Sequence, residues 1–195
     1  TARPASLSVV FVLAALALVD ARQPAFDLVL RNGRIVDGTG SPWFRADIGV
    51  RGDTIAAVAR SIEGPAGRIV DLAGQVVAPG FIDIHTHARR GLAQTPTAEN
   101  YVRQGVTTVI EGPDGSSAVP LGPFLETMAQ LQKSVNIGSF IGQGSIRAAV
   151  IGSVNRAATS EELARMVALA DQGMKDGALG LSTGLFYVPG SFTPT

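Results

Sequence analysis

Two histidines stand two positions apart in the segment GFIDIHTH, and they are the only histidines among the 195 residues. His85 and His87 follow Asp83 with the same spacing of two. Side chains alternate along a β-strand, so all three would project to one face. Neutral imidazole is the commonest metal ligand, and Asp83 is placed to orient one ring through its other nitrogen. The spacing is therefore typical of a two-histidine site for Zn²⁺ or a similar ion.

The opposite face of the same segment is largely apolar. It carries Ile82, Ile84 and Thr86, and we expect the isoleucines to pack against an outer helix. The carboxyl end of such a strand is where barrels and open α/β sheets keep their reactive groups. A His-x-His pair alone also occurs among ordinary core or surface histidines, so its meaning depends on the elements around it.

The residues before this strand have the pattern of a small all-β domain, over residues 22–78. Asn32-Gly33 and Gly52-Asp53 each predict a two-residue hairpin turn between β-rich runs, and residues 67–80 predict a third hairpin. The tripeptide at 51–53 reads Arg-Gly-Asp, which the hairpin tip explains without a role in cell adhesion.

Strands and helices alternate after Pro79. Strands are predicted at 81–87, 106–111, 135–142 and 177–184, with helices at 97–105, 122–132 and 159–173. Thr159 and Glu162 form a capping box at the start of the last helix, and an apolar stripe follows it. This alternation is typical of a parallel sheet with helices outside it. A (β/α)₈ barrel needs about 250 residues, so residues 79–195 would form its first half, about four β/α units, in a truncated fragment of a longer protein.

Composition and the first 21 residues exclude some classes of function and predict a cellular location. Sixteen basic and sixteen acidic residues cancel, and no basic patch indicates nucleic acid. The absence of cysteine excludes disulfides and thiolate zinc sites. Residues 1–21 hold a short apolar run that ends in small residues, which predicts a cleaved secretory signal and an exported, periplasmic or secreted protein without a stable membrane anchor. A buried helix or an uncleaved anchor is the alternative.

The segment VVAPGFIDIHTH, placed after a small β domain, resembles the amidohydrolase superfamily. The segments AENYVRQGVTTVIEGPDGSS and DGALGLSTGLFYVPG look like its N-acyl-D-amino-acid deacylase (D-aminoacylase) branch, and the likeness runs from Phe26 to Thr195. The resemblance implies a β-sandwich, built from both chain ends, beside a metal-dependent barrel. It also implies one or two Zn²⁺ or other divalent ions, and hydrolysis of N-acyl-D-amino acids to a carboxylic acid and a free D-amino acid.

The resemblance also implies roles for individual residues. His85 and His87 match the metal ligands of the first barrel strand. Asp114 stands where the branch often carries a cysteine ligand, and Glu111 is the competing candidate. Tyr187 matches a contact to the substrate carboxylate. Asp114 could instead be an ordinary turn residue, and Tyr187 could be packed in a loop.

Some expected parts of the site are missing from this stretch. Gln143 stands where many relatives carry a histidine. The catalytic general-base aspartate and further histidines are expected beyond Thr195, so the 195 residues alone should be inactive. A cyclic-amide hydrolase of the dihydroorotase or hydantoinase type and a non-catalytic exported binding protein remain as alternatives.

Overall fold

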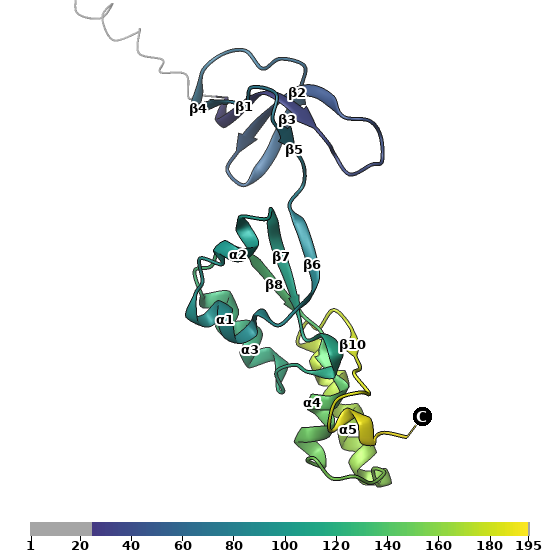
Figure 1. Ribbon diagram of the computed structural model, residues 1–195. Coiled ribbons are helices and arrows are strands. Elements are labelled where there is room, and N and C mark those ends of the chain that lie inside the picture. The colour runs from purple at the N-terminus through teal and green to yellow at the C-terminus, as the bar shows by residue number, and fades with distance from the viewer. Residues whose placement is uncertain (1–24, 195) are drawn as a thin grey trace, which may run out of the picture. The chain divides into compact units, whose positions relative to one another are not determined.

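The computed structural model describes residues 25–194, shown as coloured ribbon in Figure 1. The predicted signal segment, residues 1–21, lies outside these described residues. The chain divides between Pro79 and Gly80 into two compact units, and each is treated on its own. None of the helices within residues 25–194 has the length and apolar character needed to cross a membrane.

The N-terminal unit is a single five-stranded sheet around a small core of Ile35, Ala46 and Ile48. Its path is β3-β2-β1-β4, and β5 pairs with the far end of β1. The pairs β1–β2 and β2–β3 are antiparallel, whereas β4 and β5 both run parallel to β1. The strands are β1 (Phe26–Ile35), β2 (Phe44–Arg51), β3 (Thr54–Ala59), β4 (Ala66–Asp71) and β5 (Val76–Val77).

The predicted hairpin at Asn32-Gly33 is wrong, because β1 continues through it. The register against β2 shifts between Leu30 and Gly33, which marks a β-bulge. Asn32 takes the left-handed conformation (φ 59°) that asparagine tolerates well. Its backbone N–H donates to Asp47 at 2.9 Å, and its side-chain amide donates to Asp71 at the same distance. Hydrogen bonds to distant residues therefore stabilise a β-bulge at Asn32, where the local sequence predicts a hairpin turn.

The other two predicted hairpins have opposite outcomes. The turn at Gly52-Asp53 is confirmed, since it joins the antiparallel strands β2 and β3. The hairpin across residues 67–80 is wrong, because β4 and β5 each pair with β1 instead of with each other. Both strands run in the same direction along β1, on either side of the turn at Ala73-Gly74.

The C-terminal unit is a mixed α/β structure in which parallel strands alternate with helices. Its main sheet has the order β6-β7-β8, and a second parallel pair joins β9 to β10. The third predicted strand is interrupted at Phe140, which separates β8 from β9. The strands are β6 (Phe81–Thr86), β7 (Val106–Glu111), β8 (Asn136–Ser139), β9 (Ile141–Gly142) and β10 (Leu181–Ser182). The helices are α1 (Ala88–Gln94), α2 (Glu99–Val102), α3 (Leu121–Gln130), α4 (Gln143–Val150) and α5 (Ser160–Lys175).

Helices cover one side of this sheet. Figure 1 shows α1, α2 and α3 gathered beside β7 and β8, where Leu92, Val109 and Met128 share one buried cluster. A second cluster joins Ile146 of α4 and Met166 of α5. The predicted capping box at the start of α5 is confirmed, with the side chains of Thr159 and Glu162 each bonded to the other's backbone N–H.

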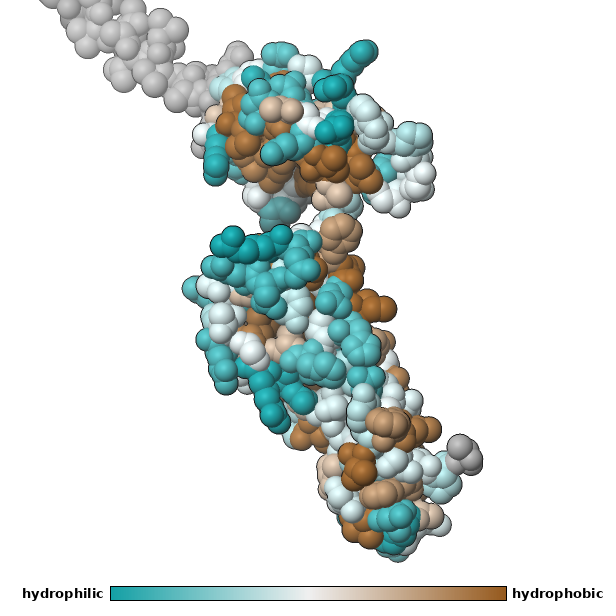
Figure 2. All heavy atoms as spheres, in the orientation of Figure 1, coloured by the Kyte–Doolittle hydropathy of each residue, from teal (hydrophilic) through white to brown (hydrophobic). Residues whose placement is uncertain are grey.

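The expected packing of the β6 isoleucines is wrong for the described residues. Ile82 is 62% exposed and Ile84 is 67% exposed, and Figure 2 shows apolar surface over this strand. The reason is that β6 lies at the edge of the sheet, while α1 packs over β7 instead. Only Thr86 on that face is buried, and its hydroxyl donates to the carbonyl oxygen of Ile110 at 2.9 Å.

Candidate metal centre

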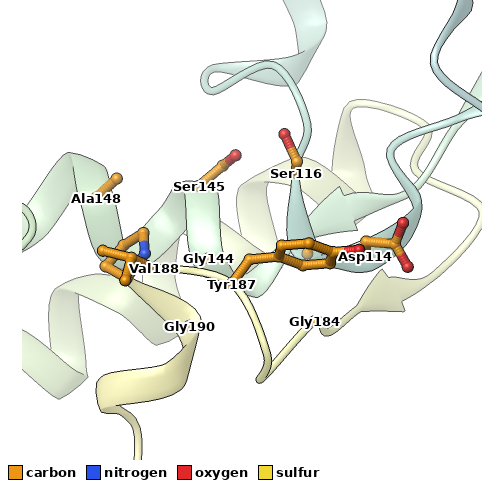
Figure 3. A pocket seen from close by; sticks show the side chains of 11 residues that line it. Asp114, Ser116, Gly144, Ser145, Ala148, Gly184, Tyr187, Val188 and Gly190 are labelled. Carbon is orange, nitrogen blue, oxygen red and sulfur yellow. The ribbon is translucent and has the colours of Figure 1, made fainter.

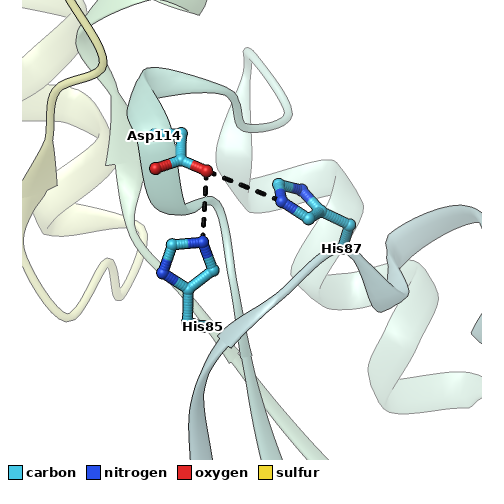
Figure 4. A group of neighbouring side chains, drawn as sticks. All are labelled: His85, His87 and Asp114. Atoms are coloured by element: carbon cyan, nitrogen blue, oxygen red, sulfur yellow. Dashed lines mark hydrogen bonds and ion pairs between the residues drawn. The ribbon is translucent and has the colours of Figure 1, made fainter.

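The structure brings His85, His87 and Asp114 together, and Figure 4 shows both imidazoles directed toward the carboxylate. The Nε2 atom of His85 lies 3.1 Å from Oδ2 of Asp114, and the Nε2 atom of His87 lies 3.6 Å from the same oxygen. One ligand atom from each of the three residues falls within 4.8 Å of the others. Two imidazole nitrogens and a carboxylate oxygen thus face a common point.

The two histidines reach this point from different backbone settings. His85 belongs to β6, whereas His87 follows the strand and is the residue that precedes α1. Their ring centroids are 5.9 Å apart and the ring planes are inclined by 76°. The side chains are 62% and 64% exposed, so an ion or a substrate can approach both rings from solvent.

Asp114 is carried by a tight loop that follows β7. Gly112 (φ 84°) and Gly115 (φ 76°) flank it in left-handed conformations, and Asp114 itself has φ 57°. Left-handed backbone is uncommon for residues other than glycine, although aspartate and asparagine tolerate it. Ser182 of β10 holds the loop from the other side, with its hydroxyl donating to the Gly112 carbonyl oxygen and accepting from the Gly115 N–H. The unusual loop conformation is therefore fixed by contacts on both sides of the carboxylate.

The two other acidic residues near the histidines have different partners. Asp83 accepts a hydrogen bond from the backbone N–H of His85 at 3.1 Å. Among the hydrogen bonds of the described residues, none joins Asp83 to an imidazole nitrogen, so its predicted contact with a ring is not formed. Glu111 is 1% exposed and lies outside the group of three ligand candidates. Its Oε2 atom accepts from the backbone N–H of Arg89 at 3.1 Å.

Tyr187 lies beside the metal candidates, in the segment after β10. It shares with His87 and Asp114 the lining of an open cavity of about 360 Å³. A neighbouring cavity of about 160 Å³ extends from Asp114 and Tyr187 to Ser116 and Ser145 (Figure 3). The two serines carried no signal in the sequence, because they belong to loop and helix positions that only the fold brings together.

Gln143 is the first residue of α4 and is partly buried. Its Nε2 atom donates to the Thr193 hydroxyl at 2.8 Å, while its Oε1 atom is buried without a hydrogen-bond partner within the described residues. It is not part of the group of three ligand candidates.

The donor set fits a divalent metal of the zinc type. Zn²⁺ is bound in proteins by imidazole nitrogen and carboxylate oxygen, and catalytic sites combine such ligands with a position left open for substrate or water. Two imidazole nitrogens and one carboxylate oxygen converge here, they are accessible to solvent, and cavities lie beside them. This arrangement matches a catalytic zinc site. The two imidazoles come from one strand end, and the carboxylate comes from the end of its parallel neighbour.

In the comparison with known proteins, residues 68–188 match the amidohydrolase family. The chain belongs to the amidohydrolase family. Most of the C-terminal unit of this amidohydrolase lies within the matched residues, including the candidate metal centre.

Individual relatives of the amidohydrolase are also similar in sequence and structure. D-aminoacylase from Alcaligenes xylosoxydans xylosoxydans is 39% identical over 193 residues, which cover 87% of this chain. A solved structure of D-aminoacylase, studied for its binuclear metal centre, superposes with a TM-score of 0.82 at 38% identity over 87% of this chain. The structure of N-acyl-D-glutamate deacylase from Bordetella bronchiseptica was solved with zinc and a phosphonate mimic of the tetrahedral intermediate. It superposes with a TM-score of 0.83 at 31% identity over 87% of this chain.

The chain spans 40% of the length of each of these three proteins. The resemblance to amidohydrolases and to their N-acyl-D-amino-acid deacylase branch, expected from the sequence, is confirmed.

Proposed function

We propose that the whole protein is a metal-dependent hydrolase that removes the acyl group from N-acyl-D-amino acids. The observation that carries the proposal is the convergence of His85, His87 and Asp114 on one point at the end of two parallel strands. The 39% identity to a D-aminoacylase supports the substrate class, a small N-acylated D-amino acid with a linear amide bond.

We infer that His85, His87 and Asp114 hold one Zn²⁺ or similar ion, with room for a second that other parts of the protein help to bind. A bound Zn²⁺ supplies Lewis-acid chemistry for amide hydrolysis. The family resemblance implies that Asp114 stands where the branch often carries a cysteine ligand, and a carboxylate oxygen can serve there as a zinc ligand in place of a thiolate. Glu111 is the weaker ligand candidate, because its carboxylate is already engaged with Arg89.

Residues beside the metal candidates would bind and orient the substrate. The phenol of Tyr187 is inferred to donate a hydrogen bond to the substrate carboxylate, since it lines the same cavity as His87 and Asp114. Ser116 and Ser145 would offer neutral hydroxyls to the rest of the substrate. The general-base aspartate would come from another part of the protein.

Architecture and location follow as further parts of the proposal. Three parallel strands with helices between them suit the first part of a (β/α)₈ barrel, and the N-terminal sheet suits one layer of a β-sandwich. The apolar run within residues 1–21 supports export to the periplasm or the medium, with removal of this segment.

An assay panel on the purified whole protein tests the function. N-acetyl-D-amino acids, N-acetyl-L-amino acids and hydantoins are offered in parallel, before and after dialysis against a chelator. We expect hydrolysis of the D-series only, lost on dialysis and restored by Zn²⁺. Opening of hydantoins with the D-series untouched would instead show a cyclic-amide hydrolase. Purification without stoichiometric metal and without turnover would show a non-catalytic binding protein.

A further inference from the structure

A buried carboxylate near the metal candidates is not one of the three residues inferred to hold the ion. Glu111, the last residue of β7, is 1% exposed. Its Oε2 atom accepts a hydrogen bond from the Arg89 backbone N–H at 3.1 Å, and its Oε1 atom lies 3.8 Å from Nε of the Arg89 side chain. Both contacts therefore go to the first turn of α1, the helix that starts directly after His87.

His87 is fixed to β7 from both sides along the chain. On one side, Thr86 pairs with Glu111 in the strand register, and its buried hydroxyl donates to the Ile110 carbonyl oxygen at 2.9 Å. On the other side, Arg89 is bound to the Glu111 carboxylate. The side chain of His87 makes no capping hydrogen bond to its own helix. The His87 ring is therefore not used to cap α1, while the backbone around it is held to β7 at Thr86 and Arg89.

We propose that Glu111 is a positioning residue for His87, acting through the first turn of α1. The inference rests on the proposed metal-dependent function, since it gives that site its supporting contact. The first N–H groups of a helix have no partner within the helix, and a carboxylate is a strong acceptor for them. Loss of a group that orients a metal ligand typically weakens metal binding by about 10- to 100-fold.

Glu111 and Glu162 offer a matched pair of glutamates for the test. Glu162 also accepts a backbone N–H at a helix start, from Thr159 at 2.9 Å, and also pairs with an arginine, Arg156. It belongs to α5 and has no contact with the three metal candidates in the described residues. Both glutamates therefore hold a helix start, but only one of these helices follows a metal candidate.

The experiment uses the whole protein and its variants Glu111→Gln, Glu111→Ala, Glu162→Gln and Glu162→Ala. Zn²⁺ affinity is measured by competition with a chelator, and hydrogen exchange of residues 86–91 is measured in the metal-free proteins. Loss of the orienting contact in Glu111→Ala should weaken Zn²⁺ binding by about 10- to 100-fold, with a smaller effect in Glu111→Gln. Exchange at 86–91 should be faster in both. The Glu162 variants should lower the melting temperature but leave Zn²⁺ affinity and exchange at 86–91 as in wild type.

Every outcome bears on the proposal. Unchanged Zn²⁺ affinity and unchanged exchange in a folded Glu111→Gln protein would overturn the proposal. If Glu111→Ala does not fold, the Glu111→Gln variant alone provides the test. Loss of one whole metal equivalent in Glu111→Gln would also overturn it, because Glu111 would then be a ligand. If the wild type binds no Zn²⁺ and hydrolyses nothing, the proposed function fails. Faster exchange in the Glu111 variants would still support the positioning of His87.

Discussion

The hydroxyl of Ser182 donates a hydrogen bond to the carbonyl oxygen of Gly112 at 2.5 Å, although 70 residues separate them in the chain. The same hydroxyl accepts a hydrogen bond from the Gly115 N–H at 3.2 Å. Asp114 lies between these two contacts, so β10 fixes the loop that carries the carboxylate of the proposed metal site. The candidate ligands thus come from the carboxyl end of β6 and the segments that follow β6 and β7, and β10 sets the position of Asp114.

Ser182→Ala should weaken Zn²⁺ binding by about 10-fold, at the lower end of the range for groups that orient a ligand. The substitution removes the hydrogen bonds of the Ser182 hydroxyl to Gly112 and Gly115, which lie on either side of Asp114. Chelator competition on the whole protein measures the effect. Ser61→Ala is the control, because the Ser61 hydroxyl bonds to the exposed Glu63 in the N-terminal unit. Equal affinities of the Ser182 variant and the wild type would contradict the role given to the bridge.

Asp114→Ala should remove most of the bound metal, with a loss of affinity above the roughly 100-fold expected for an orienting group. Asp114→Cys should retain Zn²⁺, since a thiolate is a good zinc ligand. Metal content per chain after dialysis measures both variants. Asp53→Ala, at the turn between β2 and β3, is the control and should keep the full metal content. Retention of metal by Asp114→Ala, or its loss from Asp114→Cys, would argue against ligation at this position.

The sequence predicted the parts of the site that depend on local pattern or on the family resemblance. Alternation along one strand places His85 and His87 on the same face, and the resemblance drew attention to Asp114. The capping box at Thr159 and Glu162 was also predictable, because its partners are three residues apart. These features can be predicted without knowing which distant residues lie beside them in the fold.

The rest depends on contacts between distant residues, which a single sequence does not reveal. The bulge at Asn32 is stabilised by Asp71, 39 residues away, and thus replaces the predicted hairpin. The exposure of Ile84 depends on which strand α1 packs against. Ser182 is an unremarkable serine in the sequence and becomes important only where β10 reaches the loop after β7.

Gly112→Ala should destabilise the fold more than Gly38→Ala. Both glycines have nearly the same φ, 84° and 83°, so an alanine costs about 1–2 kcal/mol in either backbone. At Gly112 a Cβ atom would also lie 2.7 Å from the Phe140 carbonyl oxygen, whereas at Gly38 it would meet no atom within 4 Å. Overpacking should add roughly 1–3 kcal/mol at Gly112. Urea unfolding of the whole protein measures the difference, and equal losses would show that the loop relaxes around the added methyl group.

The start of α5 should lose stability in acid because of Glu162. Hydrogen bonds from the Arg156 guanidinium, then from the Thr159 backbone N–H, lower the pKa of Glu162 from 4.5 to about 2. A carboxyl group with a lowered pKa in the folded state stabilises the fold above its unfolded pKa, and this contribution is lost as the pH falls toward the folded value. The wild type should therefore melt at a higher temperature than Glu162→Gln near neutral pH, and the gap should close between pH 4.5 and about 2. Melting temperatures of the wild type and Glu162→Gln across this pH range measure the gap.

Glu161→Gln is the matched control, since Glu161 lies in the same helical turn but pairs with no side chain among the described residues. A gap that stays constant down to pH 2 would show that the Arg156 pair does not stabilise the helix start.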